Sequence, residues 1–187
     1  LEYIAAHGRK PKHLFKSDPD AVYEKEYYYD LGKIEPVVAR PDNVDDVVSV
    51  DAVGHVRIHQ GFIGSCNSGR IEELRTAASI LKGKKIPEGV RLLISPASNA
   101  VYLQALQEGL MDIFIDAGAL IMNSNCSVCW GGCQGVIGEG EVLISTGTRN
   151  FKGRAGHKDS KVYLASAATV AASALAGRIV RADEVTA

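Results

Sequence analysis

The chain is short of several features that mark specialised classes of protein. No run of apolar residues approaches the roughly 18 to 20 that a membrane-spanning helix needs. Its 21 Lys and Arg nearly balance its 22 Asp and Glu, so the net charge of −1 offers no electrostatic footprint for nucleic acid or an anionic membrane. Four cysteines in 187 residues are far below the density of a disulfide scaffold, which favours a reducing cytoplasm. What is left is an ordinary globular composition, 46% hydrophobic and 23% charged.

The N-terminus lacks both a starting methionine and a signal peptide. It reads LEYIAAHGRKPKH, a polar and amphipathic stretch that is typical of the end of a helix, with Gly8 and Pro11 able to stop it. We therefore expect the chain to be a piece of a longer polypeptide.

Residues 1–50 are predicted to form a connecting segment of extended and loop structure. Within it, VYEKEYYYDL (22–31) alternates in part and is rich in tyrosine, which is typical of a strand at a sheet edge. The stretch PVVARPDNVDDVVSVDAVG (36–54) contains two prolines and an acidic cluster, which predicts an extended loop.

Residues 51–187 are predicted to form one α/β domain, because strand-like and helix-like segments alternate along them. VRLLISP (90–96) is a continuous apolar run of the kind buried in a parallel sheet. Helices are expected over 69–85, over 98–110 with Ser98 as N-cap, and over 167–177. Further strands are expected at the end of 55–65, after the helix end in 112–124, at 141–147 and at 162–166.

Three reactive side chains directly follow predicted strands: Cys66, Cys126 and Arg149. In α/β sheets, ligands bind beyond the carboxyl ends of the strands. We therefore expect a functional site at that edge of the sheet.

The cysteine-rich stretch NSNCSVCWGGCQG (123–135) leaves several chemistries open. Cys126 and Cys129 have the C-x-x-C spacing of a thioredoxin-like redox pair, although Trp130 follows the pair and no helix clearly starts at Cys126. A structural zinc site has four ligands, often in two C-x-x-C knuckles, and this single knuckle has no partner. Cys133 fits best as a small buried side chain without a role.

An iron–sulfur cluster is the remaining interpretation. A [4Fe–4S] cluster ordinarily takes four thiolates, whereas one distant cysteine and a C-x-x-C supply three. One iron would then be open to water or substrate and could act as a Lewis acid toward a hydroxyl group. The small residues around the thiolates would let backbone N–H groups approach the sulfides.

Three motifs in this order resemble those of the aconitase superfamily. FIGSCNSGRIEELRTAA (62–78) is similar to the family's first cluster-ligand motif, NCSVC (125–129) to its second and third ligands, and RNFKGRAG (149–156) to its arginine-bearing motif. The resemblance is strong over about residues 55–180 and extends more loosely back to residue 1. The most similar branch is the 3-isopropylmalate dehydratase (isomerase) large subunit, with homoaconitase and 2,3-dimethylmalate dehydratase as relatives.

The resemblance implies a layered α/β/α aconitase-like domain with a mostly parallel sheet. It implies a [4Fe–4S] cluster with one labile iron, held by Cys66, Cys126 and Cys129. It also places Arg149 and Arg154 against a hydroxy di- or tricarboxylic acid, and guanidinium forks suit carboxylates. The implied activity is that of a hydro-lyase, most simply the 3-isopropylmalate dehydratase step of leucine biosynthesis. The alternatives are homoaconitase, 2,3-dimethylmalate dehydratase, or a non-catalytic iron–sulfur or zinc-binding module.

The family's active site is assembled from several domains, and this chain carries only part of it. The five histidines, His7, His13, His55, His59 and His157, show no metal or catalytic spacing, so no catalytic acid or base is assigned to this chain. The partners implied are N-terminal large-subunit domains and a small swivelling-domain subunit that supplies a serine base. We expect no turnover from this chain alone, and neither a membrane nor nucleic acid as a partner.

The chain departs from the family pattern near the motifs. Asn67 and Ser68 follow Cys66 where the family usually has Thr and Asn, and Thr148 stands where an Asn usually precedes the arginine. Both changes keep hydrogen-bonding capacity. WGGCQG after the C-x-x-C is also unusual, and Cys133 has no place in the family pattern. The substrate therefore cannot be assigned from these motifs.

Overall fold

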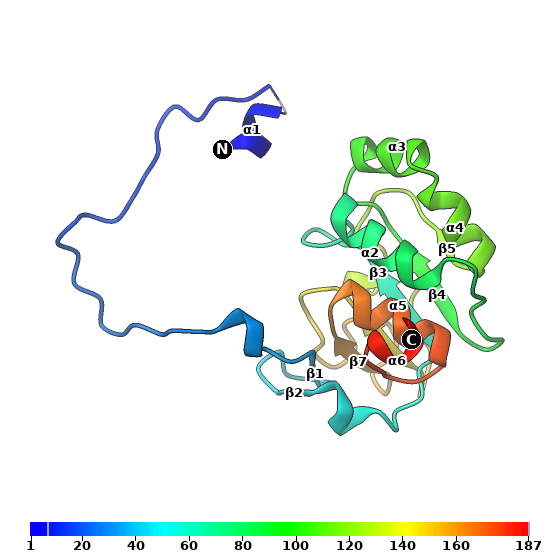
Figure 1. Ribbon diagram of the computed structural model, residues 1–187. Helices are drawn as coiled ribbons and strands as arrows, with labels where there is room; N and C mark the ends of the chain where they lie inside the picture. Colours follow the sequence, from blue (N-terminus) through cyan, green and yellow to red (C-terminus); the bar gives the residue numbers. More distant parts are fainter. Residues whose placement is uncertain (7, 187) are drawn as a thin grey trace. The chain divides into compact units, whose positions relative to one another are not determined.

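A computed structural model describes residues 1–6 and 8–186 and divides the chain into two units, Leu1–Ile34 and Glu35–Ala187. Residues 35–50, predicted as part of the connecting segment, group with the second unit. The two units are described separately (Figure 1). None of the helices in the described part of the chain has the length and apolar character needed to span a membrane.

The first unit is extended chain with little regular structure. It contains a short helix, α1 (Glu2–Ala6), and a 3₁₀ turn, η1 (Leu31–Lys33). Residues 1–5 and 8–34 are all exposed. Residues 22–31, predicted as an edge strand, contain a bend at Glu24 and the start of η1 at Leu31, and they pair with no strand among the described residues, so the predicted strand is absent from this structure. A β-strand is assigned from its hydrogen bonds to a neighbouring strand, and no described strand forms such bonds with this segment.

The second unit is built on a seven-stranded sheet in the order β2-β1-β7-β6-β3-β4-β5. The strands β7, β6, β3, β4 and β5 run parallel, whereas β1 pairs antiparallel with both β2 and β7. The bounds are β1 (Val37–Ala39), β2 (Val47–Ser49), β3 (Gln60–Ile63), β4 (Arg91–Ile94), β5 (Leu120–Ile121), β6 (Val142–Ser145) and β7 (Lys161–Leu164). The predicted α/β class with a mostly parallel sheet is confirmed.

The loop predicted over 36–54 is partly wrong, because it contains β1, β2 and a 3₁₀ turn, η2 (Val50–Val53). The prolines misled the prediction. Pro36 lies just before β1 and Pro41 just after it, positions where a missing N–H costs no ladder hydrogen bond.

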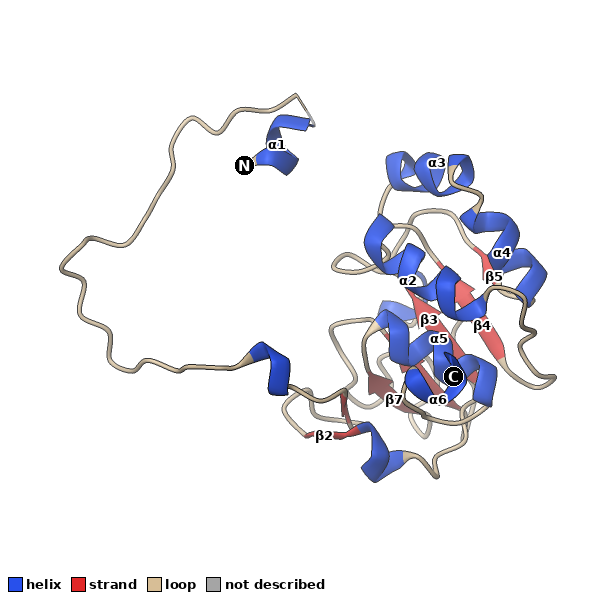
Figure 2. Ribbon diagram, in the orientation of Figure 1, coloured by secondary structure: helices blue, strands red, loops and turns tan. Residues whose placement is uncertain are grey.

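The helices α2 (Ile71–Leu81), α4 (Leu110–Ala117) and α5 (Ala167–Ala176) cover one face of the sheet (Figures 1 and 2). The helix α3 (Asn99–Gln107) packs on α2 and α4, and α6 (Asp183–Thr186) packs on α5. The Ala-rich α5 packs closely on β3 because Gly61 has no side chain: a Cβ there would lie 2.9 Å from Leu92 Cδ1 and 3.2 Å from Val170 Cγ1. Inward-facing residues of alternate strand positions, such as Ile63 and Ile94, join the main core with these helices.

The opposite face is covered by irregular chain rather than by α-helices. Side chains that point away from the helices form a second cluster with residues of the segments 123–140 and 147–160, including the 3₁₀ turn η3 (Ser127–Trp130). Its members are Phe62, Leu93, Met122, Val128, Ile137, Leu143, Ala155 and Val162. The segments that carry the cysteine-rich stretch and the arginine motif are therefore folded onto the sheet as a layer.

Candidate functional site

The three residues singled out at strand ends do follow β3, β5 and β6. Cys66 lies three residues after β3, Cys126 five residues after β5, and Arg149 four residues after β6. Since β6, β3, β4 and β5 are parallel and adjacent, their carboxyl ends meet at one edge of the sheet. The predicted location at that edge is confirmed for all three.

The first cysteine sits in a tight turn that only small residues permit. A Cβ at Gly64, whose φ is +155°, would lie 2.6 Å from the carbonyl oxygen of Ser95. The Thr146 hydroxyl clamps this turn, because it accepts from Gly64 N at 2.9 Å and lies 3.1 Å from Gly64 O. Ser65 adopts a φ of +83°, unusual for a residue with a side chain, and leaves the Cys66 thiol exposed.

The turn that carries Cys126 is held by Ser95 at the end of β4. The buried Ser95 hydroxyl lies 3.0 Å from Asn123 O and 3.1 Å from Asn125 O, and Asn125 N lies 3.3 Å from it. The Asn125 side chain in turn accepts from Ser127 N at 2.5 Å. Ser127 has a φ of +45° and is completely buried, so the residue after Cys126 is fixed while the Cys126 thiol stays exposed.

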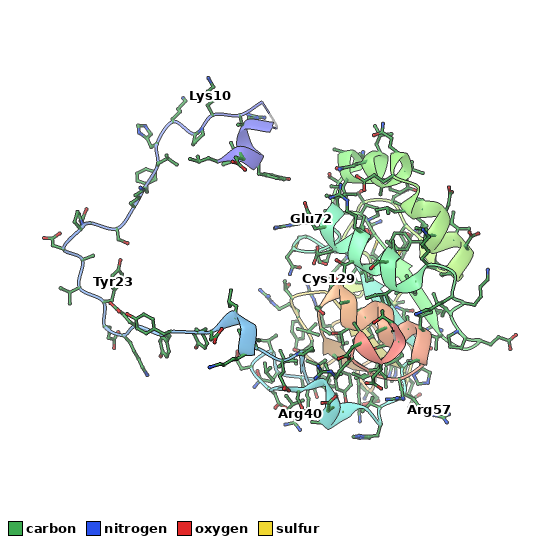
Figure 3. All side chains as sticks on the ribbon, in the orientation of Figure 1. Lys10, Tyr23, Arg40, Arg57, Glu72 and Cys129 are labelled. Carbon is green, nitrogen blue, oxygen red and sulfur yellow. The ribbon has the colours of Figure 1, made fainter. Side chains whose placement is uncertain are left out.

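Cys129, labelled in Figure 3, lies next to Gly147, which follows β6. Its amide donates to Cys126 O at 3.0 Å, which closes the η3 turn. A Cβ on Gly147 would lie 3.9 Å from Cys129 Sγ and 3.1 Å from Ser145 Oγ. Glycine at 147 therefore leaves open the space next to this half-buried thiol.

The cysteine segment also contacts the arginine segment directly. A Cβ on Gly131 would lie only 2.6 Å from Arg154 O. Ile137 N donates to Ala155 O at 3.0 Å, and His157 N donates to Ile137 O at 2.9 Å. The loops after β5 and β6 therefore form one connected layer.

Neither predicted substrate-binding arginine is neutralised by a carboxylate among the described residues. Arg149 is exposed, and its Nη1 donates to the neighbouring Thr148 O at 3.0 Å. Arg154 is half-buried, and its guanidinium carbon lies 5.4 Å from the centre of the Phe151 ring. By contrast, Arg75 and Arg91 each form an ion pair of 2.7 Å with a glutamate.

Asn150, between the two arginines, anchors their loop to residues 40–43. It is 1% exposed, and its Nδ2 donates to Arg40 O at 2.5 Å and to Asn43 O at 3.2 Å. Asp42, with a φ of +74°, donates its amide to Asn150 O at 3.0 Å. The arginine loop is therefore held by a segment that the sequence predicted to be a connector.

Buried side-chain atoms without a hydrogen-bond partner in the described part of the chain all lie in these two loops. They are Ser124 Oγ, Asn150 Oδ1 and Arg154 Nε. Buried polar groups are ordinarily satisfied, so a cluster of exceptions points to missing partners at this edge.

The structure does not gather every predicted residue into one pocket. A cavity of about 560 Å³ adjoins the edge and is lined in part by Asn67, Ser68, Thr146 and Gly147, but neither the cysteines nor the two arginines line it. Within residues 1–6 and 8–186, no three Cys, His, Asp or Glu side chains are placed to hold a single metal ion. Cys133 is not buried as predicted; it is partly exposed, with Sγ 3.9 Å from Asn125 Oδ1.

The histidines have structural contacts. His59 Nδ1 accepts from Val142 N at 3.0 Å, and His157 Nδ1 accepts from Asp159 N at 3.2 Å. The His13 ring lies 6.1 Å from that of Phe15. His7 lies outside the described residues.

The donor set fits an iron–sulfur cluster. All three thiols are free, they are soft ligands, and they approach from the loops after β3 and β5 at one sheet edge. The ligands of a cluster bind different irons, so they stand further apart than the ligands of one ion. Glycine at 147 leaves open the space beside the Cys129 thiol.

Sequence reasoning missed Ser95, Asn125, Thr146 and Asn150, which hold these loops. Ser95 and Thr146 directly follow strands, as the turns with the cysteines do, and this position could have indicated that they belong to the site. Asn150 lies inside the arginine motif, but its contact with residues 40–43 could not be read from local sequence.

Comparisons with known proteins agree with the motifs. The model of the aconitase family (aconitate hydratase) matches residues 51–177. The 3-isopropylmalate dehydratase large subunit of Hydrogenobaculum sp. (strain Y04AAS1) is 51% identical over 185 residues, which are 99% of this chain and 44% of that protein. That of Aquifex aeolicus (strain VF5) is 48% identical over 190 residues, with the same two coverages. In Archaeoglobus fulgidus, large subunit 2 is 50% identical over 164 residues, 88% of this chain and 39% of that protein. The chain thus spans less than half the length of these relatives.

Proposed function

The chain belongs to the aconitase family, and from that premise we propose that it is the cluster-bearing part of a hydro-lyase large subunit. Residues 51–187 would be the cluster-binding domain. The activity would be dehydration and rehydration of a hydroxy dicarboxylic acid, with 3-isopropylmalate dehydratase, and so a step of leucine biosynthesis, as the favoured identity. The name carried by relatives about 50% identical supports that choice.

The observation that carries the proposal is that three free thiols and two arginines without a carboxylate partner all lie on loops that follow the parallel strands β3, β5 and β6. Cys66, Cys126 and Cys129 would hold a [4Fe–4S] cluster. A cluster with three protein ligands supplies, when bound, a Lewis-acidic iron that can receive a departing hydroxyl group.

The arginines would bind and orient the substrate carboxylates. A guanidinium fork binds a carboxylate in bidentate fashion, and Arg149 has no competing acid at hand. Arg154 is held more firmly, by partial burial and by the Phe151 ring, and its unpartnered Nε leaves a donor available. Gly153, with a φ of +75°, makes the turn between them.

The remaining parts of the reaction would come from outside this chain. A base must remove the proton next to a carboxylate. None of the described histidines lies in the loops that carry the three cysteines, and His13, His59 and His157 have other contacts. We assign the base to a small-subunit partner, and further substrate contacts to other domains of the large subunit. We place the assembly in the cytoplasm, where thiols stay reduced.

The proposal is tested by anaerobic reconstitution with ferrous iron and sulfide. We expect about four irons and four acid-labile sulfides per chain, and a three-iron EPR signal after mild oxidation removes the labile iron. Cys129→Ser should abolish that signal. Cys133→Ser is the matched control and should leave it intact, because Cys133 is not among the three ligands.

Two results would refute this assignment. Zinc without sulfide would identify a structural metal module, and no cluster under any condition would mean that the motifs persist only as fold. Equal loss in the Cys129→Ser and Cys133→Ser variants would overturn the ligand set while leaving a cluster protein.

A further inference from the structure

Within residues 22–31, the stretch 25–29 has the side-chain alternation of a β-strand, although no strand among the described residues pairs with it. On one side, Lys25 Nζ lies 4.8 Å from the centre of the Tyr27 ring. The Tyr27 and Tyr29 rings stack with centroids 6.3 Å apart and planes 16° from parallel. Contacts between residues two apart arise when the backbone is extended and alternate side chains share a face.

The other side of the same segment is acidic. Tyr28 Oη donates to Glu26 Oε2 at 2.7 Å, again between residues two apart. Asp30 falls on this face by the same alternation. The segment therefore has an aromatic face with Tyr27 and Tyr29 and an acidic face with Glu26 and Asp30, the pattern of a strand with one side buried and one in water.

The end of this extended segment is defined. The Asp30 carboxylate accepts from Gly32 N at 3.0 Å and caps η1, so the extended conformation ends at Asp30. On the other side, Glu24 lies in a bend. The residues between, 25–30, have an ordinary strand length.

Nothing within the first unit covers the aromatic face. The large side chains of this segment are all more than half exposed: Val22 95%, Tyr23 57%, Tyr27 63%, Tyr28 89%, Tyr29 72% and Leu31 79%. Figure 3 labels Tyr23 and draws the side chains of this segment along a stretch of loop. Segments that stay disordered are poor in aromatic residues. The high tyrosine content of this segment is instead typical of a surface that binds a partner.

The length of the relatives indicates what that partner is. The Hydrogenobaculum protein matches 99% of this chain, including this segment, yet the match occupies only 44% of that protein. The family model, in contrast, starts at residue 51. The segment is thus a shared part of a polypeptide more than twice as long as this chain.

We propose that residues 22–31 add as a strand to an open sheet edge in the part of that longer polypeptide that lies outside this chain. The aromatic face then packs on that part, and the acidic face remains in water. Backbone N–H and C=O groups along the segment gain a ladder partner, which is how extended segments dock on sheet edges. The inference rests on the proposed function in one respect, namely that this chain is part of a longer large subunit.

The test is amide hydrogen exchange on two proteins. One is the 187-residue chain; the other is a chimera in which these 187 residues replace the matching stretch of the Hydrogenobaculum large subunit. We expect residues 22–31 to exchange fast in the chain alone, and about two orders of magnitude more slowly in the chimera. The unmodified Hydrogenobaculum subunit serves as a folded reference should the chimera not fold.

The two faces of the segment provide matched variants. Tyr27→Ser with Tyr29→Ser removes the aromatic face and should return the segment to fast exchange in the chimera. Tyr28→Ser deletes an equal ring between them on the acidic face and should leave exchange slow. Equal effects of both changes would refute a one-sided docking.

The remaining outcomes each overturn the proposal. Fast exchange in the chimera or in the reference subunit means that the segment is not paired. Slow exchange in the chain alone, with a dimer in light scattering, identifies a second copy as the partner. The cluster content, measured separately, reports on the proposed function: a protected segment without a cluster refutes the function alone, and a cluster with an unprotected segment refutes the docking alone.

Discussion

Ser65 and Ser127, each next to a cysteine, hold the backbone in the left-handed region, at φ of +83° and +45°. For residues with a Cβ this conformation costs roughly 1–2 kcal/mol. It persists only where the surroundings fix it, and such residues concentrate at functional sites. For Ser127 the fixing contacts are its amide to Asn125 Oδ1 and its hydroxyl to Gln134 O at 3.1 Å. Each of the two strained serines is thus the chain neighbour of an exposed cysteine, Cys66 or Cys126.

Ser95→Ala should loosen the cysteine turn. The Ser95 hydroxyl is buried and is the contact between β4 and the backbone of Asn123 and Asn125. Its loss leaves buried backbone groups without that partner, so we expect the free energy of unfolding to fall by about 1–3 kcal/mol. Iron and sulfide retained after reconstitution should fall as well. Urea unfolding and metal analysis measure the two effects.

Ser79→Ala is the control for this change. Ser79 is an exposed residue of α2 whose hydroxyl donates to Thr76 O at 2.7 Å within its own helix. We expect its stability to stay within about 0.5 kcal/mol of the parent and its cluster content to be unchanged. If Ser95→Ala behaves like Ser79→Ala, the serine does not hold the turn.

Residues with distinctive chemistry could be predicted from the sequence, and residues that hold them could not. Cys66, Cys126 and Arg149 were placed at strand ends from order alone, because parallel strands share a carboxyl edge. Ser95 and Asn150 carry no motif of their own. Their importance comes from partners about 30 and 110 residues away in sequence, which local patterns do not contain.

At the scale of elements, the glycine turn after η3 sets how the cysteine and arginine loops meet. Gly131 has a φ of +70°, and a Cβ there would lie 2.6 Å from Arg154 O. Gly131→Ala should cost roughly 2–4 kcal/mol, because left-handed strain is joined by a contact with backbone that cannot move without shifting the arginine loop. The urea midpoint and the cluster content both report it.

Gly140→Ala separates the two causes. Gly140 has nearly the same φ, +72°, but nothing lies within 4 Å of the position of its Cβ. We expect a loss of only about 1 kcal/mol and no change in cluster content. Equal losses for the two variants would show that backbone strain alone acts, and that the contact between the loops is not tight.

The link between α2 and the end of α3 should depend on pH. The Arg75 guanidinium binds Glu108 through bonds of 2.7 and 2.8 Å and holds the pKa of Glu108 below its ordinary 4.5. A lowered folded pKa gives a contribution that is complete above the ordinary value and is lost as the pH falls through the lowered one. Glu108→Gln should therefore reduce Tm at pH 7, and the difference from the parent should shrink below pH 4.5.

Glu88→Gln is the control for this pH dependence, since Glu88 is exposed and forms no ion pair within residues 1–6 and 8–186. Thermal melts at several pH values compare the two variants. A Tm difference for Glu108→Gln that stays constant with pH would contradict the role of the ion pair.

Elements were predictable where local pattern and burial agree. The α2 helix and strands β4 and β6 match their predicted segments. The helix has an apolar face and each strand an apolar run, and these are buried in the core. The helix predicted over 98–110 ends early, at Gln107, because Gly109 turns left-handed at a φ of +72° and α4 starts anew. Strands β1 and β2 are short and partly exposed, so their pattern was too weak to distinguish from a loop.

At the scale of the whole molecule, stability and the candidate site belong to the second unit. The buried residues of both apolar clusters lie between Val38 and Val180. The α/β class was predictable because alternation of strand and helix has few other solutions. The layer of loops on the sheet face opposite the helices was not predictable. Loop residues have no periodic pattern, and the packing of a loop depends on the side chains that it positions.

Removal of residues 1–34 should leave the stability of the second unit unchanged. The buried residues of both apolar clusters lie within residues 38–180, so the deletion removes none of them, and the free energy of unfolding should change by less than about 0.5 kcal/mol. Urea unfolding of 35–187 beside 1–187 measures this. Solubility should rise, because exposed tyrosines favour association. A loss above about 1 kcal/mol would show that the segment stabilises the second unit in solution, and its aromatic face would then need no partner outside the chain.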